Sequence, residues 1–237
     1  MARWSQAPKG ARPRQRRAPE PLPPPLPPET RTVGQLIAET IRLYGKKFWR
    51  ALPLGIPLAL TDVLAFGRDV DTQTILLWIC GPLFAAAYVW ASSLVTETPL
   101  SRGPAIAALV VGLIVFLPFP IGARVYLLPG IVILGMFGLA VPAALVERLD
   151  VRDALRRGFD LGRVDPVHAV GGLAAVCIVY FVSRGALQVL LHTQGDQAAR
   201  VAIAMADIVL GPLVFLGGAM LYFDQKARLQ RQRVRES

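Results

Sequence analysis

The chain has 237 residues, of which 54% are hydrophobic and only 18% are charged, and its mean hydropathy is +0.47. This composition excludes an ordinary soluble domain and indicates a membrane protein. The two cysteines exclude a small secreted module held together by several disulfides. Lys and Arg outnumber Asp and Glu by 26 to 16, an excess typical of proteins that bind nucleic acid or anionic lipid and of membrane proteins whose basic loops set their orientation.

Residues 1–32 form a separate region. Seven of the ten residues from Pro19 to Pro28 are proline, and four arginines precede them between positions 12 and 17. Proline has no amide hydrogen and fixes its backbone angle, so this stretch cannot continue a helix. We therefore predict a disordered, basic, proline-rich cytoplasmic tail.

An amphipathic helix is predicted for residues 33–48. Apolar side chains recur there every three or four residues, with charged residues between them. Thr32 and Gln35 have the spacing of a capping box, which marks the start of a helix. A core helix would show the same pattern, but Lys46–Lys47 stand beside Phe48–Trp49 directly before an apolar segment. This combination favours a helix at the membrane interface.

Six apolar segments follow, with lengths that suit a hydrocarbon core about 30 Å thick, which takes roughly 20 helical residues to cross. They comprise residues 51–66, 74–95, 104–123, 125–146, 166–191 and 201–223. The first is the weakest, because it contains Pro53, Pro57 and Asp62. Two prolines and a glycine between positions 118 and 122 predict a tight turn between the third and fourth segments.

A second amphipathic helix is predicted for residues 150–162, in the longest inner loop, where Asp150 can cap the first turn. Setting Val33 beside Val151 aligns apolar positions of the two amphipathic helices, which indicates a weak internal repeat. Both helices carry cations that are expected to contact the anionic inner leaflet. Each cation near the surface contributes about 1 kcal/mol to membrane binding. The expected lipid-contacting residues are Lys46, Lys47, Arg50, Arg152, Arg156 and Arg157. The predicted fold is thus an all-α polytopic membrane bundle, in residues 33–223, of six transmembrane helices plus two cytoplasmic interfacial helices.

The distribution of basic residues predicts the orientation. With both termini in the cytoplasm, 22 of the 26 basic residues fall in inner segments, and only Arg68, Arg124, Arg184 and Arg200 fall in outer ones. Cationic loops are retained in the cytoplasm, so we predict a multi-pass protein of the cell membrane with a basic cytoplasmic tail at residues 224–237. This arrangement accounts for the positive net charge without nucleic acid as a partner.

Three charged residues lie inside the predicted spans. Asp62 is near the outer end of the first span, Arg184 is in the fifth, and Asp207 is in the outer third of the sixth. An unpaired charge at membrane depth costs about 2.5–3.5 kcal/mol on insertion scales. We therefore expect Asp207 to face the bundle interior or the outer interface within reach of Arg184 or a neighbouring polar group. Two alternatives stay open: a carboxylate that only reaches water, and a pathway for a substrate or a proton.

Several short motifs resemble those of a known group of proteins. The motifs are Thr32–Leu36, Arg42–Tyr44, Phe48, Val146–Glu147 and Ala154–Gly158. They resemble a broad, poorly characterised group of bacterial polytopic proteins that are related to the membrane domain of glycerophosphoryl diester phosphodiesterases. In the fused members the phosphodiesterase activity belongs to a separate soluble barrel of roughly 250 residues, for which this chain has no room. The resemblance, over about residues 32 to 223, therefore implies a membrane architecture without enzyme activity.

The sequence contains no catalytic or phosphate-binding motif, and neither of its two histidines has neighbours at metal-ligand spacing. We therefore predict a non-enzymatic protein without cofactor or metal. The leading hypothesis is a membrane scaffold or accessory component that acts through lipid and protein contacts. The alternative is a permease-like subunit of an ATP-driven transporter, in which the 147–165 loop would contact a nucleotide-binding protein partner.

Overall fold

The protein is an all-α helical bundle in the computed structural model, which describes residues 27–121, 127–191 and 195–236. Within these ranges there is no strand, and six helices are long and apolar enough to cross a membrane. They are Phe48–Ala65, Val70–Thr96, Arg102–Ile121, Pro129–Val146, Pro166–Leu190 and Gln197–Arg235. The predicted polytopic bundle is therefore confirmed. Residues 1–26 of the predicted disordered tail and the end of the predicted turn near Arg124 lie outside the described residues. The prediction of disorder is wrong for the end of that tail, because Pro28–Thr30 form a 3₁₀ turn and Arg31 is held by an ion pair with the buried Asp224.

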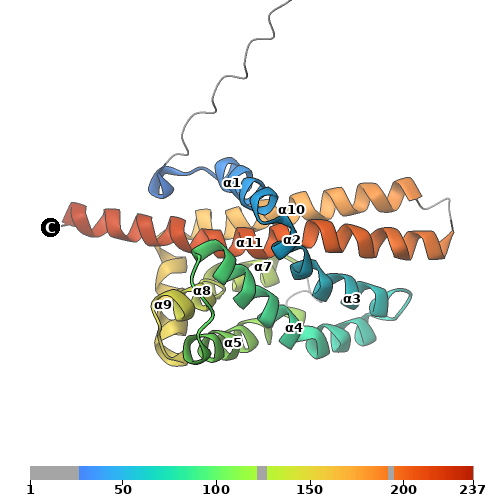
Figure 1. Cartoon of the computed structure of the whole chain (residues 1–237), viewed down its shortest axis with the longest axis horizontal. Coiled ribbons are helices and arrows are strands. Elements are labelled where there is room, and N and C mark those ends of the chain that lie inside the picture. The colour runs from blue at the N-terminus through green and yellow to red at the C-terminus, as the bar shows by residue number, and fades with distance from the viewer. Residues whose placement is uncertain (1–26, 122–126, 192–194, 237) are drawn as a thin grey trace, which may run out of the picture.

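The elements follow the chain in a simple order (Figure 1). They are η1 (Pro28–Thr30), α1 (Val33–Lys46), α2 (Phe48–Ala51), η2 (Leu52–Gly55), α3 (Ile56–Ala65), α4 (Val70–Thr96), α5 (Arg102–Phe116), α7 (Leu127–Phe137), α8 (Ala140–Val146), α9 (Val151–Val164), α10 (Pro166–Leu191) and α11 (Asp196–Glu236).

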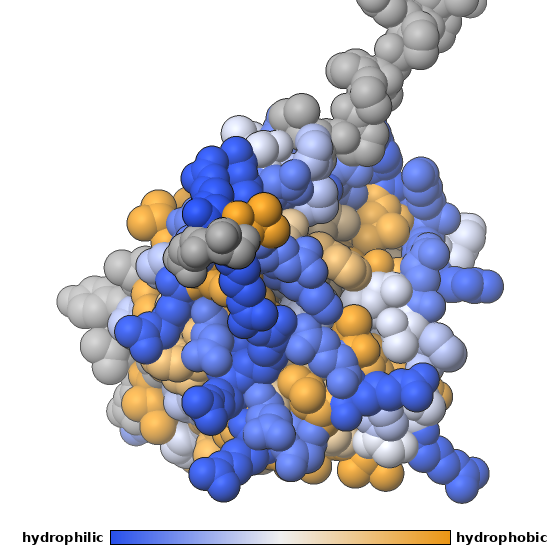
Figure 2. Space-filling view, turned by 90° about the vertical axis from the view of Figure 1, so that its left-hand side faces the viewer, coloured by the Kyte–Doolittle hydropathy of each residue, from blue (hydrophilic) through white to orange (hydrophobic). Residues whose placement is uncertain are grey.

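Helices α10 and α11, which follow each other in the chain, lie side by side along the long axis of the molecule (Figure 1). One end of the bundle carries η1, α9 and the last turns of α11, and we call it the terminal end. The opposite end carries the end of α3 and the first turns of α11. Figure 2 shows the terminal end, where many hydrophilic side chains gather, with hydrophobic ones between them.

Prolines divide the first span into short pieces. Pro53 stands in the first turn of η2 and Pro57 in the first turn of α3, and neither can donate a backbone hydrogen bond. The span therefore consists of α2, the 3₁₀ turn η2 and α3. Gly55 lies directly on α11, since a Cβ atom there would sit 2.4 Å from the carbonyl oxygen of Asp207. Only glycine permits this approach of the broken span to α11.

Proline also interrupts the fourth span, where α7 ends at Phe137 and α8 begins at Ala140. The ring of Pro142 clashes with the carbonyl group four residues earlier, which is that of Gly138 at the break. In α11, by contrast, Pro212 lies inside an uninterrupted helix. One turn before Pro212, the hydroxyl of Tyr44 donates a hydrogen bond of 2.8 Å to the carbonyl oxygen of Val209, which fixes α1 against this part of α11.

The last helix is much longer than the predicted span. The sequence predicts a span that ends at residue 223 and a separate tail from residue 224. The structure has no helix end there, because α11 continues to Glu236. Asp224 and Gln225 are fully buried. The chain has neither glycine nor proline after Gly218, so nothing in the sequence terminates the helix at the end of the apolar segment.

The two amphipathic helices use equivalent faces. Helix α1 buries Leu36, Thr40 and Tyr44 against α10 and α11, and α9 buries Ala154, Gly158 and Gly162, each 118 residues later, against α7 and α8. The glycines bring α9 close, since a Cβ atom on Gly158 would meet the backbone nitrogen of Ala140 at 2.4 Å. The aligned burial matches the repeat that the sequence suggests.

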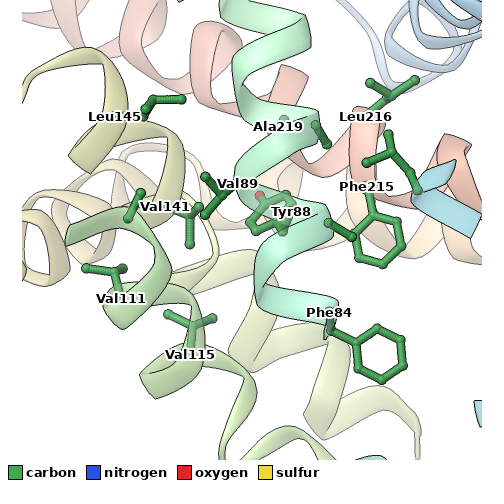
Figure 3. Close-up of a cluster of buried hydrophobic side chains, with 14 of the residues drawn as sticks. Phe84, Tyr88, Val89, Val111, Val115, Val141, Leu145, Phe215, Leu216 and Ala219 are labelled. Carbon is green, nitrogen blue, oxygen red and sulfur yellow. The ribbon is translucent and has the colours of Figure 1, made fainter. Parts of the chain in front are cut away.

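The main core lies where α4, α5, α8 and α11 meet. Its side chains, shown in Figure 3, include Phe84, Tyr88, Val111, Val115, Val141, Leu145, Phe215 and Leu216. Large apolar side chains on the outside are exposed, for example Ile79 and Val182, each at 66%. In water such surfaces would be unfavourable, whereas a hydrocarbon environment accommodates them.

Candidate functional site

Four polar side chains meet near the opposite end of the bundle, and we call them the Arg184 cluster. They are Asp62 of α3, Tyr180 and Arg184 of α10, and Asp207 of α11. Arg184 donates from Nε to Oδ1 of Asp207 at 3.1 Å and from Nη2 to Oδ2 of Asp62. Tyr180, one helical turn from Arg184, donates its hydroxyl to the same Oδ1 of Asp207 at 2.5 Å. The structure thus brings together all three of the charged residues predicted inside the spans, and the expected pairing of Asp207 with Arg184 is present.

Burial within the Arg184 cluster is uneven. Asp207 is fully buried, and its Oδ2 atom has no hydrogen-bond partner among the described residues. The side chains of Arg184 and Asp62 are 22% and 31% exposed. The cluster therefore has a closed side at α11 and an open side at α3 and α10.

A closed ring of polar contacts joins distant parts of the chain at the terminal end, and we call it the Asp224 ring. Arg31 donates to Asp224 at 2.8 Å, and Nε2 of His168 lies 3.2 Å from the same carboxylate. Asp165 accepts from the backbone amide of His168 at 3.0 Å and from Arg228 at 2.7 Å. Arg228 closes the ring by donating to the carbonyl oxygen of Arg31 at 2.9 Å. The ring ties the start of α1 and the start of α10 to α11.

A second network at the terminal end centres on Glu147, at the end of α8. Arg157 of α9 donates to it from Nε at 2.9 Å and from Nη2 at 3.3 Å. Tyr222 and Lys226 of α11 also contact its Oε1 atom, at 2.8 and 3.1 Å. Partial burial raises the pKa of Glu147, but the hydrogen bonds from Arg157, Tyr222 and Lys226 outweigh burial, and the pKa lies below its usual range. The carboxylate stays charged and fixes α9 to α11.

The six cations expected to contact lipid divide into two groups. Two of them form intramolecular ion pairs: Arg157 binds Glu147, and Lys47 binds Glu97 at 2.8 Å and also the carbonyl oxygen of Leu94. The hydrogen bond and charge of Lys47 hold the pKa of Glu97 below its usual range. The other four are exposed: Lys46, Arg50, Arg152 and Arg156. Exposed arginines that the prediction did not include stand on the last turns of α11, at positions 231, 233 and 235.

The Arg184 cluster and the Asp224 ring mark the two ends of an apolar band. Residues 208–223 of α11 and residues 169–183 of α10 contain no charged side chain. Asp207 and Asp224 are 17 residues apart on α11, a separation of about 26 Å along the axis at 1.5 Å per residue. This length is close to the thickness of a hydrocarbon core.

No pattern in the sequence singles out the Asp224 ring. Its members are ordinary charged residues in charge-rich segments, and Arg31 and Arg228 are separated by 197 residues. One signal was present: Asp165–Pro166 is a typical start of a helix, with an N-cap side chain and proline in the first turn. The described residues contain no group of three or more His, Cys, Asp or Glu that could hold a metal ion.

Comparison with protein-family models, with curated proteins and with solved structures gave no match. The resemblance to the membrane domain of the phosphodiesterases therefore stays a prediction.

Proposed function

We propose that this protein is a non-enzymatic component of the bacterial cell membrane, with both termini in the cytoplasm, that acts as a scaffold or accessory protein by binding anionic lipid and a protein partner. The observation that carries the proposal is the terminal end itself. There, exposed arginines project from α9 and α11, and the Glu147 network and the Asp224 ring hold these two helices in fixed positions.

A helix held in place favours lipid binding by the cations on it, because less backbone freedom is lost when a headgroup is bound. Arg152 and Arg156 are exposed on α9, whose opposite face is buried against α7 and α8. Each cation near an anionic leaflet contributes about 1 kcal/mol. The same surface offers a protein partner a rigid helix rather than a flexible loop.

Native mass spectrometry of the purified protein with phosphatidylglycerol or phosphatidylcholine tests this proposal. We expect preferential retention of phosphatidylglycerol, and Arg152→Gln together with Arg156→Gln should weaken retention roughly fivefold per arginine. Arg68→Gln, which removes an exposed cation at the opposite end, is the matched control. Equal retention of the two lipids, or an equal loss in the control, would contradict the proposal.

A permease-like subunit is the second candidate, and the broken first span favours it. Transporters place their sites where spanning helices are interrupted, and here η2 contacts α11 at Asp207, within the Arg184 cluster. Helix α9 would then be the contact for a nucleotide-binding partner. Recovery of an ATPase with the wild-type protein, and its loss after Arg152→Glu with Arg156→Glu, would support transport over the scaffold role.

A further inference from the structure

The guanidinium group of Arg184 binds two different carboxylates through one edge. Its Nε donates to Asp207 and its Nη2 donates to Asp62. These two N–H groups are parallel and are spaced to match the two oxygens of a single carboxylate. The Glu147 network shows the ordinary arrangement, because Nε and Nη2 of Arg157 contact the two oxygens of Glu147 alone.

The shared edge forces two carboxyl groups close together. The oxygens of Asp62 and Asp207 occupy positions that would normally belong to one carboxylate, so two full negative charges there would repel strongly in a poorly hydrated site. One guanidinium cannot neutralise both. With both aspartates ionised, the cluster would carry one uncompensated negative charge at the edge of the apolar band.

Among the described residues, no second cation contacts the cluster. Helix α3 contributes Asp62, and α10 contributes Tyr180 and Arg184. The next charged residue on α11 is Arg200, seven positions from Asp207, and its guanidinium stacks on the ring of Phe66 at 4.5 Å. The charge deficit is therefore not met from α3, α10 or α11.

We propose that Asp62 and Asp207 together bind one proton in the folded protein at neutral pH. The proton forms an O–H group on one carboxyl and so removes the repulsion between two carboxylates, as in other pairs of acids that share a proton. The cluster is then neutral. Full enclosure of Asp207 supports a proton over a larger cation, because its unpaired Oδ2 atom is inaccessible to solvent and a metal ion would stand beside the guanidinium. The proton exchanges through Asp62, whose side chain is 31% exposed, because the guanidinium group of Arg184 stays protonated and cannot pass a proton on.

Infrared spectroscopy of the purified protein in nanodiscs tests the proposal directly. At neutral pH the wild type should show the carbonyl stretching band of a protonated carboxyl group, and this band should shift in heavy water. Asp207→Asn and Asp62→Asn should each abolish it, because either change leaves one carboxylate that Arg184 neutralises. Glu147→Gln, at a carboxylate with its own arginine, should leave the band unchanged.

Each outcome decides the proposal. Absence of the band in the wild type, or its persistence in Asp62→Asn, would overturn the shared proton. Circular dichroism verifies that each variant is folded.

Thermal unfolding gives a second readout. At neutral pH both aspartates are ionised in the unfolded chain, so the folded protein binds one proton more than the unfolded chain. Raising the pH should therefore destabilise the wild type. Asp62→Asn lacks the shared proton and should show a flatter dependence between pH 6 and 9. The same slope in both proteins would contradict the proposal.

Discussion

At the scale of single residues, the structure relies on a few side chains that serve several elements at once. Glu147 is the clearest example, since one carboxylate receives Arg157 from α9 and Tyr222 and Lys226 from α11. Removing its charge leaves these donors without their partner, which costs more than the loss of an isolated surface pair.

We expect Glu147→Gln to lower the free energy of unfolding by about 1–2 kcal/mol at pH 7. Because the pKa of Glu147 is lowered in the folded protein, its contribution is complete above the pKa of the unfolded chain and is lost as the pH falls through the folded pKa. The difference between variant and wild type should therefore shrink in acid, as measured by thermal unfolding in detergent. Glu39→Gln, at a carboxylate that pairs with Arg42 of the same helix, should change stability little at either pH, because the pair joins no separate elements.

Gly55 is a second residue on which the packing depends. Gly55→Ala places a methyl group against the backbone of Asp207 and Ile208, and the resulting shift of η2 should cost about 1–3 kcal/mol. Gly45→Ala, in α1 with no atom near the added Cβ, should instead be neutral or stabilising by up to about 1 kcal/mol. Thermal unfolding of the two variants side by side checks this, and equal effects would show that the contact between η2 and α11 contributes nothing.

At the scale of elements, α11 carries residues of all three polar networks. Its apolar part was predictable from hydropathy, which reports where a chain prefers lipid. Its true end was not, because hydropathy says nothing about where a helix stops. Asp224, Gln225 and Arg228 belong to the packed bundle through their contacts with α10 and with the segment before α1.

Two truncations separate the packed part of this extension from the exposed part. Ending the chain after Leu229 removes only exposed or terminal residues and should leave the unfolding temperature almost unchanged. Ending it after Phe223 removes Asp224 and Arg228, leaves Arg31 and Asp165 without their ion-pair partners, and should lower the unfolding temperature by several degrees. Similar behaviour of the two truncated proteins would mean that the Asp224 ring does not stabilise the bundle.

At the scale of the whole molecule, the sequence predicted what depends on composition and failed where contacts are distant. The six spans follow from apolar segments of suitable length, and the Arg184 cluster was accessible because charged residues inside such segments are rare and must find partners. The Asp224 ring was inaccessible, since its members are joined only by the fold. Likewise, two of the six expected lipid contacts, Lys47 and Arg157, are used within the protein, which their positions on amphipathic helices do not reveal.

The proposed orientation predicts which positions meet water. Both native cysteines are buried, so single cysteines can be introduced and labelled with a membrane-impermeant maleimide. Arg68→Cys should react in intact spheroplasts, Arg156→Cys only in inside-out vesicles, and Val182→Cys, exposed at 66% but within the apolar band, in neither. Labelling of positions 68 and 156 from the same side would contradict the prediction that the two ends of the bundle lie on opposite sides of the membrane.

The Asp224 ring also determines when the molecule can be completed during synthesis. Arg31 begins the packed part of the chain, yet its partners Asp224 and Arg228 are 193 and 197 residues later, and α1 packs chiefly on α11 and α10. Because a ribosome releases a chain from its amino terminus onward, α1 is made well before the two helices on which it packs. The final assembly step therefore joins the first helix made to the last two.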